Sequence, residues 1–192
     1  KFTTWLGAGN IIMTTLRSMR EMVDSVKAID NSMVSLKKVT DETDKTYRRF
    51  LQGASKDAVQ LGTTITSLID ASSTFARLGF NLPDAAELGR VASLYYNVAD
   101  GVSSIDDASQ DIVSIMKAYR LEASDAIDIV DKLNRVGNEF SISSGGLGNA
   151  LRRSAAALAE ANNDINQSLA LITAANNVIQ DPDVVGNMWK TV

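Results

Sequence analysis

The 192-residue sequence contains no cysteine and no histidine. Without cysteine the chain can form neither a disulfide nor a thiolate ligand, and its redox compartment cannot be inferred. Without histidine it lacks the commonest general base and the commonest metal ligand, so a zinc site would need carboxylates alone. We therefore expect no metal, no cofactor and no enzymatic activity.

Proline and long apolar runs are scarce as well. Two prolines and twelve glycines, in a chain rich in Ala, Ser, Asp, Leu and Asn, favour helices joined by short polar turns. The best apolar stretch, residues 2–16, is interrupted by threonine, glycine and asparagine and is shorter than the about 20 residues that span a membrane. No signal peptide is recognisable. The net charge of −4, with both signs interspersed, argues against a general affinity for nucleic acid or anionic membranes.

Residues 1–53 are predicted to form one long helix. Between Asn10 and Gly53 there is neither proline nor glycine, and apolar residues recur in steps of three and four with a slip from a strict heptad. A helix of about 40 residues would be about 60 Å long, which favours a coiled coil or packing between subunits. The alternative is a bundle helix that folds back on its own chain. The predicted oligomer seam consists of Ile12, Leu16, Met19, Val23, Val26, Ile29, Met33 and Leu36.

Residues 54–192 are predicted to form a bundle of short antiparallel helical hairpins, so the expected fold class is all-α. A similar motif recurs five times: a large aliphatic residue, a few small or acidic residues, and an amphipathic run. In four of the five copies a good N-cap precedes the aliphatic residue; these caps are Asn81, Ser104, Ser141 and Asp164. The residues three positions later resemble capping boxes, namely Asp84, Asp107, Ser144 and Gln167. In the remaining copy Arg120 occupies the cap position, so its helix is expected to start at Ser124.

Two groups of polar residues are candidate sites. The segment "SSGGLGNALRR" (143–153) has glycines before a helix and two arginines, which could bind an anion. It lacks the lysine of a P-loop and no strand precedes it, so a turn or a helix cap is the favoured interpretation. The aspartates at 106–107 and 181–183 lack EF-hand spacing and are better explained as helix caps and solvated faces.

Three collinear stretches carry a family resemblance: "FARLGFNLPDAA" (75–86), "DIVDKLNRVGNEFSISSGGLGNALRRSA" (128–155) and "LITAANNVIQDPDVVG" (171–186). With them, residues 58–192 resemble the tape measure proteins of long-tailed bacteriophages. The chain starts at Lys1 and stops within a helical pattern, so we expect it to be a segment of a longer polypeptide.

The resemblance implies a structural tail-assembly protein that fills the lumen of the tail tube, sets tail length and is released during DNA ejection. Implied partners are copies of itself (a trimer, or alternatively a hexamer), the tail tube protein, distal tail and hub proteins at the tip, and tail assembly chaperones. No specific nucleic acid binding is implied, and membrane contact only during ejection. The implied location is the virion, in the tube lumen or at the tail tip, and the host cytoplasm during assembly. The alternative function is a helical adaptor with a coiled-coil stalk and a peptide-binding groove.

Overall fold

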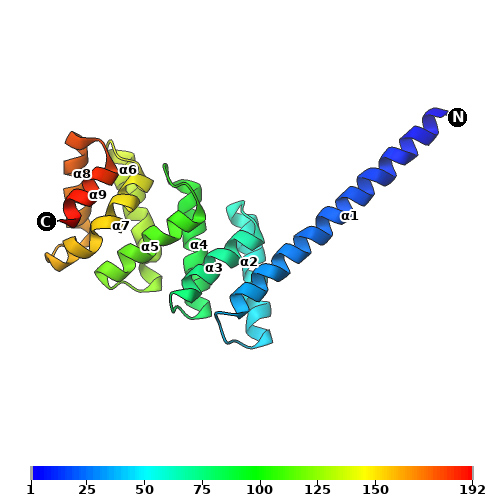
Figure 1. Cartoon of the computed structure of the whole chain (residues 1–192), viewed down its shortest axis with the longest axis horizontal. Helices are drawn as coiled ribbons and strands as arrows, with labels where there is room; N and C mark the ends of the chain where they lie inside the picture. The colour runs from blue at the N-terminus through cyan, green and yellow to red at the C-terminus, as the bar shows by residue number, and fades with distance from the viewer. Residues whose placement is uncertain (1, 192) are drawn as a thin grey trace.

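A computed structural model describes the backbone of residues 2–191 and the side chains of residues 20–191. Within that range all regular elements are helical: nine α-helices and one short 3-10 helix, with no strand. The predicted all-α class is confirmed. Figure 1 shows the helices stacked along the long axis of the molecule, with α1 projecting from one end. None of the described helices has the length and apolar character needed to span a membrane.

The first helix is long but ends earlier than predicted. Helix α1 (Phe2–Lys37) has 36 residues, and α2 (Asp44–Leu61) runs through Gly53. A single helix extending to residue 53 is therefore wrong, and the expected boundary at 53/54 lies inside α2. Helix α2 ends instead at Gly62, whose φ of 63° is left-handed and costs glycine little.

The break at residues 38–43 has a local cause. Val39, Thr40 and Asp41 are weak helix formers, and the hydroxyl of Thr40 donates to the carbonyl of Leu36 at 2.8 Å. Thr43 then caps α2, because its hydroxyl accepts from the amide of Thr46 at 3.2 Å. The hydroxyl of Tyr47 lies 2.8 Å from that of Thr40 and so links the new helix back to the turn.

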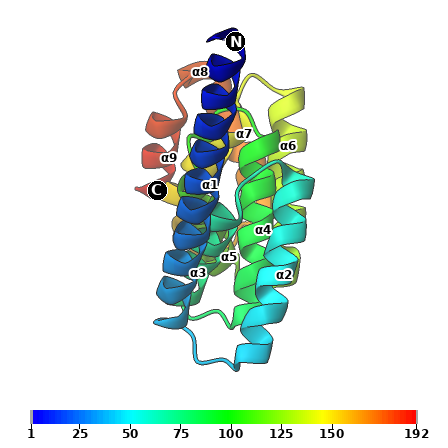
Figure 2. The same ribbon diagram turned by 90° about the vertical axis from the view of Figure 1, so that its right-hand side faces the viewer.

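The remaining helices form the body of the molecule: α3 (Ile65–Arg77), α4 (Leu82–Val98), α5 (Ile105–Tyr119), the 3-10 helix η1 (Ala123–Asp125), α6 (Ala126–Glu139), α7 (Ser144–Glu160), α8 (Ile165–Ile179) and α9 (Pro182–Lys190). Helix α1 packs on α3, and α2 packs on α3 and α4; Figure 2 shows this end of the stack. Helix α7 is the hub of the other end, because α5, α6, α8 and α9 all pack against it.

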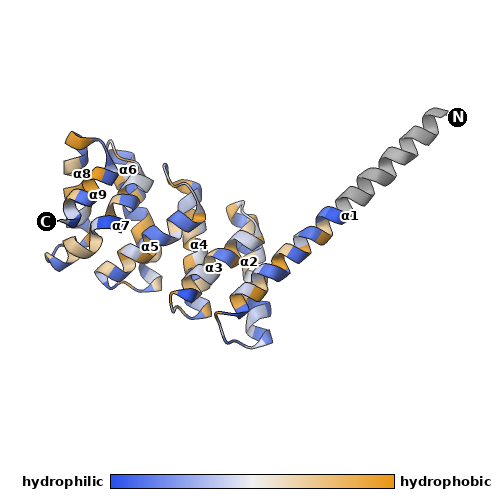
Figure 3. Ribbon diagram, in the orientation of Figure 1, coloured by the Kyte–Doolittle hydropathy of each residue, from blue (hydrophilic) through white to orange (hydrophobic). Residues whose placement is uncertain are grey.

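The core follows from the amphipathic patterns, which Figure 3 shows as alternating polar and apolar stretches along the helices. Its largest fully buried side chains include Phe75 of α3, Tyr95 of α4, whose hydroxyl reaches α7, and Leu147 and Leu151 of α7 itself. Helix α2 joins the body through a second, smaller cluster of Ala54, Ala58 and Leu68. Because two of these are alanines, this cluster buries far less apolar area than the main core.

Three of the four predicted N-caps cap a helix in the structure. Asn81 accepts from the amide of Asp84 at 2.9 Å, Ser104 from that of Asp107 at 3.0 Å and Asp164 from that of Gln167 at 2.8 Å. Of the predicted capping boxes, the pair Asp164 and Gln167 is reciprocal, since Gln167 also accepts from the amide of Asp164. At Asp84 and Asp107 the acid bonds instead to the side chain of the cap residue.

The cap predicted at Ser141 is displaced by two residues. Helix α7 is capped by Ser143, whose hydroxyl accepts from the amide of Gly146 at 3.0 Å. The carbonyl of Ser141 instead accepts from the side-chain amide of Asn176 at 3.0 Å, which links this loop to α8. The helix after Arg120 begins with η1, one residue before the expected Ser124, and the carboxylate of Asp125 accepts from the amide of Glu122 at 2.9 Å. Arg120 itself ends α5 in a left-handed conformation.

The displaced cap gives a matched pair of variants. Ser143→Ala removes the bond to the Gly146 amide and should lower the free energy of unfolding by about 1 kcal/mol. Ser141→Ala removes only an exposed hydroxyl and should change it by less than about 0.5 kcal/mol. Denaturant unfolding followed by circular dichroism measures both. A larger loss for Ser141→Ala would contradict the assignment.

Candidate functional site

The structure places residues of the predicted oligomer seam in different environments. Met33 and Leu36, near the end of α1, are buried in the chain's own core, where α1 packs on α3. These two residues therefore stabilise the fold of one chain and are not available to a partner, which corrects their assignment to the seam. Ile12, Leu16 and Met19 lie outside the residues whose side chains are described.

The described turns of α1 that precede Met33 are exposed to solvent. Val23 and Val26 are 52 % and 65 % exposed, and Met22 on the same side is 69 % exposed, while Ile29 is half-buried. At 3.6 residues per turn, Met22, Val26 and Ile29 continue the line of Met33 and Leu36. One face of α1 is thus covered by α3 near its C-terminal end and bare beyond the body of the molecule (Figure 1). We call Met22, Val23, Val26 and Ile29 the α1 stripe.

The glycine-rich segment lies in a helix and not in a turn. Gly145, Gly146 and Gly148 belong to the first turns of α7. A methyl group on Gly145 would collide with the backbone of Gly101, in the loop between α4 and α5, and one on Gly148 would lie 2.5 Å from the hydroxyl of Tyr95. These glycines therefore allow close approach of α7 to its neighbours. The anion site predicted as an option for residues 143–153 finds no support, because Arg152 and Arg153 pair with aspartates.

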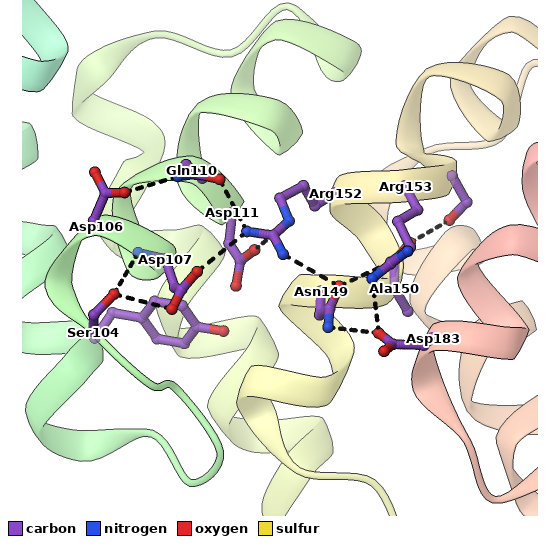
Figure 4. Close-up of polar contacts among 12 residues, drawn as sticks. Ser104, Asp106, Asp107, Gln110, Asp111, Asn149, Ala150, Arg152, Arg153 and Asp183 are labelled. Atoms are coloured by element: carbon purple, nitrogen blue, oxygen red, sulfur yellow. Dashed lines mark hydrogen bonds and ion pairs between the residues drawn. The ribbon is translucent and has the colours of Figure 1, made fainter.

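Those pairs form a polar network that joins α5, α7 and α9 (Figure 4). Arg152 of α7 lies 3.6 Å from a carboxylate oxygen of Asp107 and 3.5 Å from one of Asp111, both on α5. Arg153 donates to Asp183 of α9 at 3.1 Å, and Asn149 donates to the same oxygen at 2.7 Å. A polar cavity of about 320 Å³ adjoins the network. Within the described residues no group of three or more Asp or Glu is placed to hold a metal ion.

Asp111 is the most unusual residue of this network. It is 3 % exposed, and its Oδ1 accepts no hydrogen bond although Nε of Arg152 lies 3.5 Å away. Burial raises the pKa of the Asp111 carboxyl to about 7, against the opposing effect of Arg152. Burial likewise raises the pKa of the neighbouring Tyr95 hydroxyl, which donates to the carbonyl of Ser144 at 2.9 Å. The network therefore joins α5, α7 and α9 through charged and polar side chains.

Sequence patterns could have indicated Asp111. It lies on the apolar side of α5, three residues after Ala108 and four before Ile115, where a charged residue is out of place. Nothing in the pattern identified Arg152 as its partner, because the two residues lie on different helices.

A comparison with protein families gives one match. The model of the phage-related minor tail proteins matches residues 55–192, which is well over half of the chain. The chain belongs to this family. No solved structure matches it. The matched range covers most of α2 and all of α3 to α9, whereas α1 precedes it.

Membership of this family indicates where the chain is located and what kind of role it has. The family assigns the chain to the tail of a phage or phage-related particle, in a structural role beside other tail components.

Two glycine variants test the close packing of α7. Gly145→Ala places a methyl group against the backbone of Gly101, which cannot move aside as a side-chain end can, so we expect the free energy of unfolding to fall by about 1–3 kcal/mol or more. Gly53→Ala, inside α2 with no atom near the added methyl group, should raise it by about 0.5–1 kcal/mol. Equal effects in thermal or denaturant unfolding would contradict this account.

Asp111→Asn tests the buried carboxyl through the pH dependence of unfolding. A carboxyl whose pKa is higher in the folded than in the unfolded chain destabilises the fold increasingly as pH rises from about 4 to about 7. The effect is complete above the folded pKa, and each pH unit between the unfolded and the folded pKa corresponds to about 1.4 kcal/mol. Relative to Asp111→Asn, the unmodified chain should therefore lose a few kcal/mol of stability across this range, with Asp128→Asn as an exposed control. Parallel pH profiles would show that Asp111 ionises normally.

Proposed function

We propose that this chain is a segment of a tape measure protein, which fills the lumen of the tail tube, sets tail length and leaves the tube during DNA ejection. Membership of the minor tail family supports a tail role. The observation that carries the finer proposal is the helix α1, which projects from the family-matched module and keeps an apolar stripe exposed.

The physical argument concerns length. A molecular ruler needs a stiff element with a constant rise per residue, and an α-helix supplies 1.5 Å for each residue. Helix α1, with 36 residues, would extend about 54 Å on this basis. The module of α2 to α9 would be the folded part that docks on other components near an end of the tail.

The proposed partners follow from the same role. Copies of the chain associate through the α1 stripe, as a trimer or alternatively a hexamer. The tail tube protein surrounds the helical part, hub and distal tail proteins contact the folded module at the tip, and chaperones bind the chain in the host cytoplasm before the tube forms. Contact with a membrane belongs to ejection alone.

Tail length measured by electron microscopy tests the proposal. An in-frame deletion in the helical part of the full-length protein, outside residues 55–192, should shorten the tails by about 1.5 Å for each residue removed. Duplication of the same block should lengthen them by the same amount. Assembled tails of unchanged length in both variants would overturn the ruler function and favour an adaptor.

A further inference from the structure

A groove lies between α6 and α8, at the end of the molecule opposite to α1 (Figure 1). It has a volume of about 450 Å³ and an apolar floor. The floor and walls include Val136 and Phe140 from the end of α6 and Leu169, Ala170 and Ala174 of α8. Phe140 is 49 % exposed. Grooves of this kind between two helices receive the apolar face of a third helix.

The rim of the groove along α8 is polar. Asn166 and Asn177 border it, whereas Thr173, which also lines it, is 5 % exposed and its hydroxyl oxygen is shielded from the groove. The groove therefore favours an occupant that is apolar in its centre and polar at the edge toward α8.

The α1 stripe, apolar along its centre and polar along its edges, matches the groove in polarity. By helical periodicity Arg20 and Lys27 lie along one edge of the stripe, and Asp30 lies on the same side, one heptad after Val23. Ser25 lies on the other edge. The stripe and the groove lie at opposite ends of the long axis of the molecule, so a stripe cannot reach the groove of its own chain (Figure 1). A stripe that docks in this groove therefore comes from a second copy.

Charges of opposite sign follow one another in matching order along the α1 stripe and along the groove. Along α6 the groove is bordered by Asp128, Asp131, Lys132 and Arg135. Asp128 and Lys132 pair with each other, so Asp131 and Arg135 are the charges offered to an occupant. When α1 lies parallel to α6, Lys27 comes beside Asp131 and Asp30 beside Arg135, because three residues of one helix match four of the other to within about 1.5 Å. The serine edge then faces α8, and Ser25, two residues before Lys27, comes near the start of α8, where Asn166 lies on the rim.

We propose that the α1 stripe of one copy docks in the α6/α8 groove of the next copy. The inference rests on the proposed function only in that copies associate through α1; it names the surface that receives the stripe. A contact between two different surfaces is heterologous, so repeated use of it gives a ring or an open filament and not a closed two-fold dimer.

Two variants with complementary defects test this contact. Val26→Asp damages the stripe and Ala174→Arg damages the groove, and both positions are exposed, so both variants should fold. Ala28→Asp on the opposite side of α1 and Ala161→Arg in an exposed turn are the matched controls. Sedimentation velocity over a range of concentrations measures association. Each variant should associate at least about ten-fold more weakly than the unmodified chain, while the controls should not.

A mixture of the two variants gives the decisive measurement. Ala174→Arg retains an intact stripe and Val26→Asp an intact groove, so the mixture should form a 1:1 complex that cannot grow further. Lys27→Glu and Asp131→Lys should each weaken association several-fold, and the mixture of these two variants should recover it.

Two results would contradict the proposed contact. Association of Ala174→Arg at the strength of the unmodified chain would overturn the groove as the receiving surface and leave pairing of one α1 with another. An unmodified chain that remains monomeric at all concentrations would overturn the contact altogether. Neither result bears on tail length, which tests the proposed function separately.

Discussion

The contact of the first turn of α7 with the loop between α4 and α5 is the constraint on which most of the structure depends. Gly145 lets the two backbones meet, and its amide donates to the carbonyl of Asp100 at 2.8 Å. Because α5, α6, α8 and α9 all pack on α7, the position of this one turn determines where the far end of the molecule lies relative to α3 and α4. Backbone contact fixes a distance more sharply than side-chain contact, since no rotamer can absorb an error.

The network of Asp107, Asp111 and Arg152 also fixes how α7 lies against α5, through electrostatic contacts. Burial of a charge is costly unless a partner compensates it, and Arg152 compensates Asp111 only in part. Such a pair contributes little net stability but penalises any other alignment of α5 and α7, because a shift of either helix would leave the carboxyl without its cation. In a tail component that must present defined surfaces to its neighbours, a single alignment matters more than additional stability.

Local signals were sufficient for the helices and for most of their starts. Apolar periodicity predicted the all-α class, and the caps at Asn81, Ser104 and Asp164 depend on residues only three positions apart. The failures involve competition or distance. Ser141 and Ser143 are both good caps, and α7 uses the second, while the backbone carbonyl of Ser141 accepts from Asn176 of α8. The break after Lys37 begins at weak helix formers, and Tyr47, seven residues after Thr40, bonds back to it and so links α2 to the turn. The role of Gly145 and the pairing of Asp111 with Arg152 exist only once distant helices have met.

Helix α1 acts as a lever whose fulcrum is its short contact with the body of the molecule. Its described contacts with the body are concentrated around Met33 and Leu36, while the α1 stripe lies some turns further out. Sixteen residues separate Leu36 from Arg20, a span of about 24 Å, so a rotation of about 10° at the fulcrum displaces the outer end by about 4 Å. That displacement is sideways and amounts to about three quarters of the 5.4 Å helical pitch. A small repacking around Leu36 thereby moves the far end of α1 laterally across any surface that it meets.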